Sequence, residues 1–323
     1  MATQTFYAQQ SANRRNSLLL VLLIAALLAA LGFAIGYGTT GQTASGAVVT
    51  AGAVVLALVL SLVCYFGGDS IVLAASGARQ VTEQDAPQLL NVVQEMTIAA
   101  GVPMPRVYII DDTAPNAFAT GRDPRHASIA ITTGLLQKLD REELQGVIGH
   151  ELSHVRNLDI RFALLVAVLV GSIALLADIF LRWGFWGGRS SSRERGGGGL
   201  QVIVFILAIV LAILAPIFAR MVQLAVNRQR EYLADASSVE LSRNPYGLER
   251  ALAKIAGDRE VLEVANRATQ HLYIVNPIKK FEERSRGLFS THPPVVDRIN
   301  RLRALHGASP LTGEVAEALD QRD

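Results

Sequence analysis

The chain has 323 residues, of which 50% are hydrophobic and 18% are charged, a balance shifted toward membrane proteins. Its formal net charge of +2 gives no reason to expect nucleic acid as a partner. The single cysteine, Cys64, excludes an intrachain disulfide and a cysteine-based metal knuckle. Any metal site must therefore use histidine, aspartate or glutamate.

Two apolar segments open the chain, at residues 17–37 and 46–66. Both lack charged residues and each is about long enough to cross a bilayer. Arg14 and Arg15 precede the first segment, so the positive-inside rule keeps the N-terminus in the cytoplasm and returns the chain there after Gly67. A cleaved signal peptide is the alternative, but the first apolar run is longer than a normal signal core and a second span follows.

Two short strands are predicted next, at residues 106–111 and 128–132, because both are rich in β-branched residues. Residues 115–119 between them are predicted to form an extended link. With the helical patterns elsewhere, these strands predict a mainly α protein with a small β-sheet, an α+β fold.

The sequence His150-Glu151-Leu152-Ser153-His154 is the most informative motif. Two imidazoles four residues apart lie one helical turn apart and aim at a single point, where a metal ion can bind. Glu151 lies beside that point and could take a proton from water. The alternative is a chance pair of core or surface histidines on one helix.

The surrounding residues favour a helix at this motif. Asp140 followed by Glu143 forms a capping-box pattern. The next apolar residues recur at spacings of three and four and predict a buried stripe, with the motif at its border: Leu144, Val147, Ile148, Leu152 and Val155.

A third protein ligand is needed for a catalytic metal, and Glu231 is the strongest candidate. Residues 227–235 are expected to be helical, so Glu231 and Asp235 share one face, and Asp235 could accept a hydrogen bond from a ligand histidine. The alternative is a solvated acidic face paired with Arg228. Spacing alone does not decide between them.

Two more apolar segments follow the motif, at residues 162–177 and 200–219. The first is short and ends at Asp178; the second is long enough to cross and contains Pro216. Residues 183–199 between them are rich in glycine and serine and carry three arginines, whose translocation would oppose the usual charge bias. A full crossing and an apolar pair that only dips into lipid both stay open.

Four motifs occur together in one order: HELSH at 150–154, ExxxD at 231–235, PNAFATG at 115–121, and THPP at 291–294 followed by Arg298 and Ile299. The combination is highly specific, and it resembles the HtpX-type membrane zinc metalloproteases, kin to the CAAX prenyl proteases. The resemblance extends from the first apolar hairpin to about Leu302.

The resemblance implies a zincin-type metalloprotease domain on transmembrane helices. One Zn²⁺ per chain would be bound by His150, His154 and Glu231, with Glu151 as general base. Asn116, Ala117 and Phe118 would lie beside the substrate cleft.

The active site would face the cytoplasm from a bacterial-type cell membrane. The substrates would be misfolded or damaged proteins, chiefly membrane proteins, degraded as quality control under stress.

Three further residues are candidates for supporting roles: Asp235, His292 and Arg298. His292 could donate a hydrogen bond to the oxyanion of the transition state or simply form a turn before two prolines. Arg298 could orient an acid of the site or cover a helix end. Both questions stay open at this point.

The membrane topology is limited by the requirement that His154 and Glu231 meet at one ion. Between these two residues the chain must cross the membrane either not at all or twice. Residue 162 lies only eight residues after His154, so the site must lie close to the membrane surface. The expected division is a cytoplasmic tail (1–16), a transmembrane hairpin (17–66), a protease part with the HExxH helix (67–160), a second apolar hairpin (161–219) and a protease part with the third ligand (220–323).

Two other functions compete with a quality-control endopeptidase. A processing protease for prenylated C-termini is disfavoured by the short chain with only four apolar segments. A membrane adaptor that keeps the metal but cleaves nothing is disfavoured by Glu151, since a structural site has no use for a base there. Protein substrates and the lipid bilayer are the expected partners.

Overall fold

The computed structural model describes residues 6–186, 199–258, 260, 274, 293–313, 316 and 319. The chain divides into two compact units. Met1–Tyr65 with Phe162–Gln223 form the helical unit, and Phe66–Arg161 with Leu224–Asp323 form the sheet unit. Each unit is therefore built from two separate stretches of the chain.

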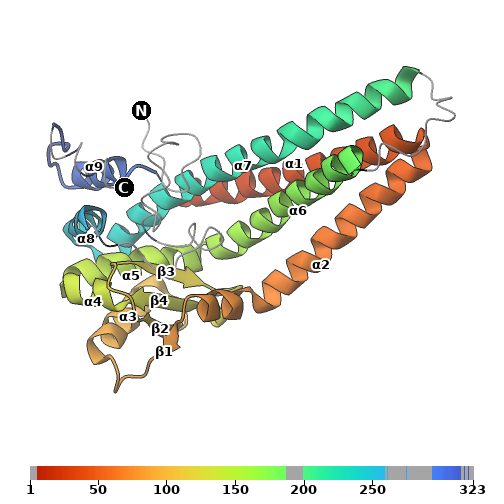
Figure 1. Cartoon of the computed structure of the whole chain (residues 1–323). Coiled ribbons are helices and arrows are strands. Elements are labelled where there is room, and N and C mark those ends of the chain that lie inside the picture. The colour runs from red at the N-terminus through yellow and green to blue at the C-terminus, as the bar shows by residue number, and fades with distance from the viewer. Residues whose placement is uncertain are drawn as a thin grey trace. The chain divides into compact units, whose positions relative to one another are not determined.

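Four long helices, labelled in Figure 1, supply the described residues of the helical unit: α1 (Phe6–Thr40), α2 (Thr43–Ala75), α6 (Asp159–Trp186) and α7 (Gly199–Ser242). The last part of α2, the first residues of α6 and the last part of α7 belong to the sheet unit. All four are long and apolar enough to cross a membrane. Large apolar side chains remain exposed on them, such as Leu18 (61%), Val48 (70%) and Leu200 (62%), a pattern suited to contact with lipid tails.

The third apolar helix is longer than the sequence suggested. α6 begins at Asp159 and continues through Asp178 to Trp186, where 162–177 looked short. The reason is local: the Asp178 carboxylate lies 2.8 Å from Nε of Arg182, one turn later on the same helix. Charged residues that pair in this way do not end a helix, and α6 reaches spanning length.

The sheet unit contains a four-stranded sheet in the order β1 (Arg79–Gln80), β2 (Arg106–Ile110), β4 (Ser128–Thr132) and β3 (Ala117–Thr120). β2 and β4 are parallel, whereas β1 and β3 pair antiparallel with their neighbours. Residues 115–119, predicted as an extended link, lead into and form part of β3, which pairs in register with β4. Two of the four residues of β3 are alanines and only Thr120 is β-branched, whereas β2 and β4 hold three β-branched residues each.

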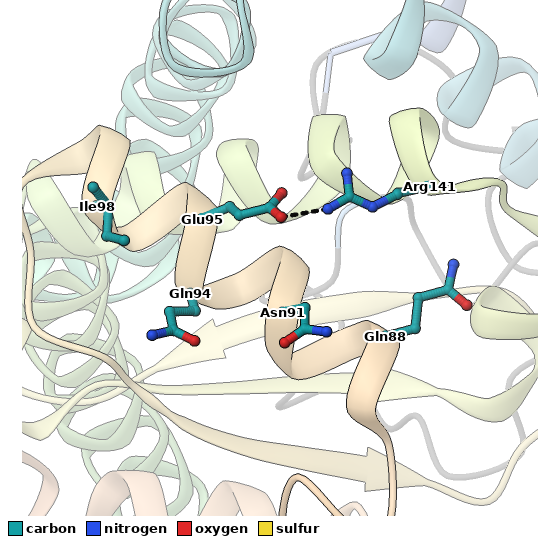
Figure 2. A pocket seen from close by; sticks show the side chains of 6 residues that line it. All are labelled: Gln88, Asn91, Gln94, Glu95, Ile98 and Arg141. Carbon is teal, nitrogen blue, oxygen red and sulfur yellow. Dashed lines mark hydrogen bonds and ion pairs between the residues drawn. The ribbon is translucent and has the colours of Figure 1, made fainter.

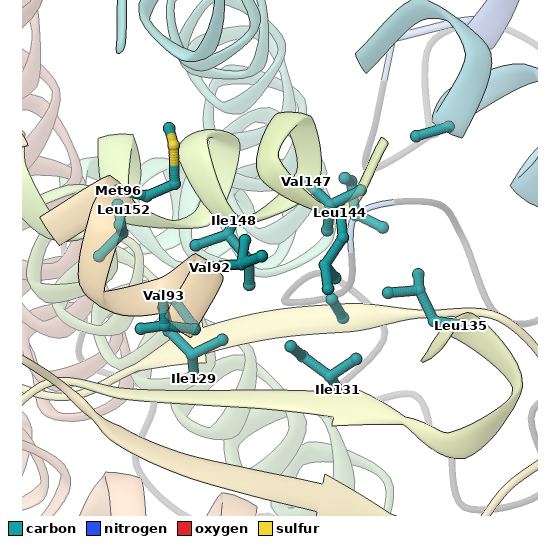
Figure 3. Close-up of a cluster of buried hydrophobic side chains, with 14 of the residues drawn as sticks. Val92, Val93, Met96, Ile129, Ile131, Leu135, Leu144, Val147, Ile148 and Leu152 are labelled. Carbon is teal, nitrogen blue, oxygen red and sulfur yellow. The ribbon is translucent and has the colours of Figure 1, made fainter. Parts of the chain in front are cut away.

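Helices α3 (Pro87–Ala100) and α5 (Arg141–Arg156) pack on one face of this sheet. In Figure 3, Val92 and Val93 of α3 and Ile148 of α5 meet Ile129 and Ile131 of β4 in a buried cluster. α4 (Thr133–Lys138) follows β4, while α8 (Pro245–Gly257) and α9 (Val295–Leu305) complete this unit. The core thus fixes α5, the helix that carries the HExxH motif.

Close packing of α5 on α8 depends on a glycine. A Cβ atom at Gly146 would lie 2.5 Å from the backbone nitrogen of Leu248. Only a residue without a side chain lets these two helices approach so closely, and the contact holds the motif helix from the side away from the sheet.

Candidate metal centre

The motif helix forms as its sequence predicts. The Asp140 side chain accepts from the backbone N–H of Glu143, and the Glu143 side chain accepts from the backbone N–H of Asp140, which completes a capping box. All five residues of the apolar stripe are buried. His150 and Glu151 are also buried, at 1% and 2% exposed, rather than lying at the border of the stripe.

Three side chains from two helices converge on one point. His150 Nε2 lies 3.2 Å from His154 Nε2, and each of these atoms lies 3.5 Å from one oxygen of Glu231 on α7. Ligand atoms about 2.0–2.1 Å from a tetrahedral ion stand about 3.3–3.4 Å apart. The distances therefore fit a metal ion bound by these three side chains, which form the single such group among the described residues.

A carboxylate contacts the second ring nitrogen, Nδ1, of each histidine. Nδ1 of His150 lies 3.0 Å from Oδ1 of Asp235, and Nδ1 of His154 lies 3.1 Å from Oδ2 of Asp159. These contacts favour a proton on Nδ1 of each ring, leaving Nε2 to face the metal point. Nδ1 of His154 is hydrogen-bonded to Asp159, whereas Nδ1 of His150 makes a close ion-pair contact with Asp235.

Buried arginines in turn hold these carboxylates. Arg298 on α9 is fully buried and binds Asp235 through two hydrogen bonds, from Nε (2.9 Å) and Nη2 (2.7 Å). Its Nη1 lies 3.6 Å from Oε2 of Glu231. Arg230 forms an ion pair with Asp159 in the same manner. These contacts with two acids of α7 are the ones expected if Arg298 orients an acid of the site.

Two of these contacts involve Asp159 and Arg230, which were not predicted from the sequence as site residues. Asp159 follows Leu158, whose φ of +58° places a bulky residue in the left-handed region. This sharp turn between α5 and α6 brings Asp159 back onto His154. Nothing in the sequence pattern signals such a turn at a leucine.

Glu151 is placed beside the edge strand β3. Burial raises its pKa, His150 and His154 lower it, and the backbone N–H of Ala119 bonds to its carboxylate and also lowers it; the net pKa lies above the ordinary value. A raised pKa makes this carboxylate a stronger base for accepting a proton from water.

Burial and neighbouring carboxylates act in opposite directions on the two histidines. Burial lowers the pKa of His150, but the hydrogen bonds to Asp235 and Glu231 outweigh it and leave the pKa above 6.5. Burial likewise lowers the pKa of His154, and bonds to Asp159 and Glu231 raise it well above 6.5. Below these raised pKa values, metal binding must displace protons from the two rings.

The residues expected near the substrate lie on or just before β3. Asn116 is buried, and its side-chain oxygen accepts from the backbone N–H of Ala117 at 3.0 Å. The side chain of Ala117 belongs to the core on the α5 side of the sheet, whereas Phe118 packs with Ile110 in the cluster on the opposite face. The backbone of β3, rather than the Phe118 ring, lies next to Glu151.

The remaining sequence candidate, His292, lies outside the described residues. A separate polar groove runs along α3, lined by Gln88, Asn91, Gln94, Glu95, Ile98 and Arg141 (Figure 2). Its one carboxylate, on Glu95, is paired with Arg141. The groove thus offers no set of metal ligands and is distinct from the centre on α5 and α7.

Comparison with known proteins identifies the family. A family model described as peptidase family M48 matches residues 83–306. A protease HtpX homolog of Ligilactobacillus salivarius is 44% identical over 297 residues, covering 92% of this chain and 98% of that protein. One from Thermoanaerobacter pseudethanolicus is 43% identical over 310 residues, covering 94% and 99%.

Among solved structures, the crystal structure of S. mikatae Ste24p aligns with a TM-score of 0.47 and 17% identity, over 91% of this chain and 66% of that one. The family match spans most of the chain, including the HExxH helix and the segment with Glu231. This chain therefore belongs to peptidase family M48 and to its HtpX-type members, as an integral membrane metalloprotease.

Proposed function

We propose that the chain binds one Zn²⁺ through His150, His154 and Glu231 and uses it to hydrolyse peptide bonds. The observation that carries this proposal is the convergence of the two Nε2 atoms and the Glu231 carboxylate at 3.2–3.5 Å. Two neutral imidazoles and one carboxylate are a ligand set that zinc favours in peptidases, with a position left for water or substrate.

Each surrounding side chain has a role in the proposed reaction. When bound, zinc supplies the Lewis acidity that polarises a peptide carbonyl and makes water more acidic. Glu151 takes the proton of the attacking water and passes it to the leaving amine. Asp235 and Asp159 keep the imidazoles in the tautomer that presents Nε2, and Arg298 fixes Asp235.

We propose that the substrate lies along β3, with Asn116, Ala117 and Phe118 bordering the cleft. Among the described residues β3 is the last strand of the sheet, the N–H of Ala119 reaches the Glu151 carboxylate, and the Ala117 carbonyl accepts a hydrogen bond from the N–H of Ile274. An edge strand can pair with an extended peptide through backbone hydrogen bonds. Such pairing would bring a peptide bond of the substrate next to the general base. It would depend little on the side chains of the substrate, as suits a protease with varied substrates.

The proposed topology keeps both stretches of the sheet unit in the cytoplasm, with the 1–16 tail there too. Residues 67–160 and 220–323 would form the protease, and the hairpins 17–66 and 161–219 would lie in the membrane. Support comes from the spanning length of α6 and α7, which fits two crossings between His154 and Glu231. Reporters fused after Gly67 and after Arg220 should both report cytoplasm; opposite compartments would contradict a shared site.

The proposed substrates are misfolded or damaged membrane proteins, degraded in quality control under stress. The five-residue separation of His154 from the candidate membrane span that begins at Asp159 supports membrane proteins as substrates. The test compares cleavage of a destabilised and a stable variant of one membrane protein in the same proteoliposomes. Faster cleavage of the destabilised variant is expected. Selective cleavage of farnesylated over unmodified C-terminal peptides would instead favour the prenyl-processing alternative.

Metal identity is tested directly on purified protein. Wild-type protein should contain about one zinc per chain by elemental analysis, and chelation should remove zinc and casein hydrolysis together. Glu231→Ala should lose both, because it removes a ligand bond and a compensating charge. If chelated protein stays fully active, or Glu231→Ala keeps its zinc, the assigned ligand set is wrong.

A further inference from the structure

A concavity on the sheet unit, separate from the metal centre, is rich in arginine. It forms between the second half of α2, the start of β2 and the short helix η1 (Pro124–His126). Its lining combines positive charge with two apolar side chains: Phe66, Asp69, Ser70, Met104, Arg106, Arg122, Arg125, His126 and Ala127.

The charges in this concavity do not balance. Arg106 pairs with Asp69 at 2.8 Å, and Asp123 next to the concavity contacts both His126 (2.8 Å) and Arg122 (3.7 Å). Among the described residues, three guanidinium groups thus face two carboxylates, one of which also contacts the His126 ring. The described side chains therefore carry an excess of positive charge, which favours an anion.

The apolar part of the lining is organised around Phe66. The guanidinium carbon of Arg122 lies 5.5 Å from the centre of the Phe66 ring, within the range of a cation–π contact. Met104 stays 46% exposed beside them. The same concavity therefore offers arginine donors for an anion and exposed apolar surface for a hydrocarbon group attached to it.

Because Phe66 lies on α2, its distance from the end of the apolar span can be measured along that helix. The apolar span on α2 ends at Val63, three residues before Phe66 and six before Asp69. At 1.5 Å per residue these positions lie about 4.5 Å and 9 Å past the end of the span. The polar layer on each side of a bilayer is about 5–8 Å thick. Measured along α2, Phe66 therefore lies within this polar layer, and Asp69 lies just past it.

We propose that this concavity binds the phosphate group of an anionic glycerophospholipid. Arginine side chains match the geometry of phosphate oxygens. Phe66 and Met104 would contact the glycerol backbone and the first carbons of the acyl chains. Basic residues directly beside a membrane span favour anionic over zwitterionic lipids. The proposal is independent of the peptidase chemistry.

The test uses the full-length protein purified in detergent with defined lipid added. Native mass spectrometry compares retention of phosphatidylglycerol with that of phosphatidylcholine, in wild type and in Arg122→Gln/Arg125→Gln. Phosphatidylglycerol should be retained selectively by wild type. Each lost arginine should weaken its binding about five-fold, so the double variant should lose about 25-fold.

Two controls separate a specific site from general charge and from loss of folding. Arg79→Gln removes an exposed arginine of the same unit that does not line the concavity, and it should bind as wild type does. Arg122→Lys/Arg125→Lys keeps the charges and should recover most of the binding. Circular dichroism during heating should give similar unfolding temperatures for all variants without added lipid.

Three results would overturn the proposal. Equal retention of the two lipids by wild type would mean that the concavity does not select anionic headgroups. Wild-type retention in Arg122→Gln/Arg125→Gln would place the lipid elsewhere. Displacement of phosphatidylglycerol by millimolar inorganic phosphate would identify a site for free phosphate rather than for a membrane lipid.

Discussion

Asp159 offers the sharpest test of how residues around the metal centre affect metal affinity. It contacts the proposed ligand His154 but is not itself a proposed ligand. Its Oδ2 lies 3.1 Å from Nδ1 of His154, and its other oxygen pairs with the buried Arg230. Removing the partner of a ligand histidine typically weakens metal binding about 10- to 100-fold, or about 1.4–2.7 kcal/mol. Asp159→Ala should fall in this range.

A conservative variant separates the effect of orienting the His154 ring from the effect of the negative charge of Asp159. In Asp159→Asn, an amide oxygen can still accept the Nδ1–H of His154, but the charge that pairs with Arg230 is lost. We expect a loss of zinc affinity near the low end of that range for Asp159→Asn, and a larger loss for Asp159→Ala. Affinity is measured by competition with a chromogenic zinc chelator, and thermal unfolding is followed on the same samples.

Asp85→Asn is the matched control, since Asp85 caps an exposed turn through Thr82 and lies in the same unit. It should bind zinc as wild type does. The reasoning fails if Asp159→Ala binds zinc within about two-fold of wild type. It also fails if Asp85→Asn loses as much affinity as Asp159→Ala, because the effect would then reflect any lost carboxylate.

Other predictions address the buried arginine, pH and packing. Arg298→Met leaves Asp235 buried without its bidentate partner and should lower the free energy of unfolding by about 3–5 kcal/mol; denaturant titration that finds less than 1 kcal/mol would contradict this. Metal-free protein should lose stability as pH rises from 6.5 through the raised pKa values of His150 and His154, because protonation of these histidines stabilises the folded state. The rise in unfolding temperature caused by zinc should grow over the same pH range, and parallel pH profiles with and without zinc would exclude this coupling. Gly146→Ala should destabilise the protein by about 1–3 kcal/mol because its Cβ meets Leu248, whereas Gly257→Ala, which meets nothing within 4 Å, should not; equal thermal shifts would refute the packing argument.

The sequence predicted what depends on local pattern. Helical periodicity, the Asp140–Glu143 capping box and the strands at 106–111 and 128–132 are each encoded within a few residues, and all are confirmed. The same holds for the shared face of Glu231 and Asp235, since four residues make about one helical turn.

What the sequence could not predict depends on contacts between distant segments. β3 forms by backbone pairing with β4, and two of its four residues are alanines, which carry little strand preference. Asp159 reaches His154 only because Leu158 takes a left-handed conformation that is rare for leucine. The role of Arg298 needed the position of α9 beside α7, which brings together residues 63 positions apart.

The most direct test of the central claim is Glu151→Gln, measured for zinc content and for hydrolysis of casein on the same purified sample. Glutamine has nearly the same shape but cannot take a proton from water, and His150, His154 and Glu231 remain. The account predicts about one zinc per chain, as in wild type, with hydrolysis reduced to background. Hydrolysis near the wild-type rate, or loss of the zinc in this variant, would contradict the role assigned to Glu151.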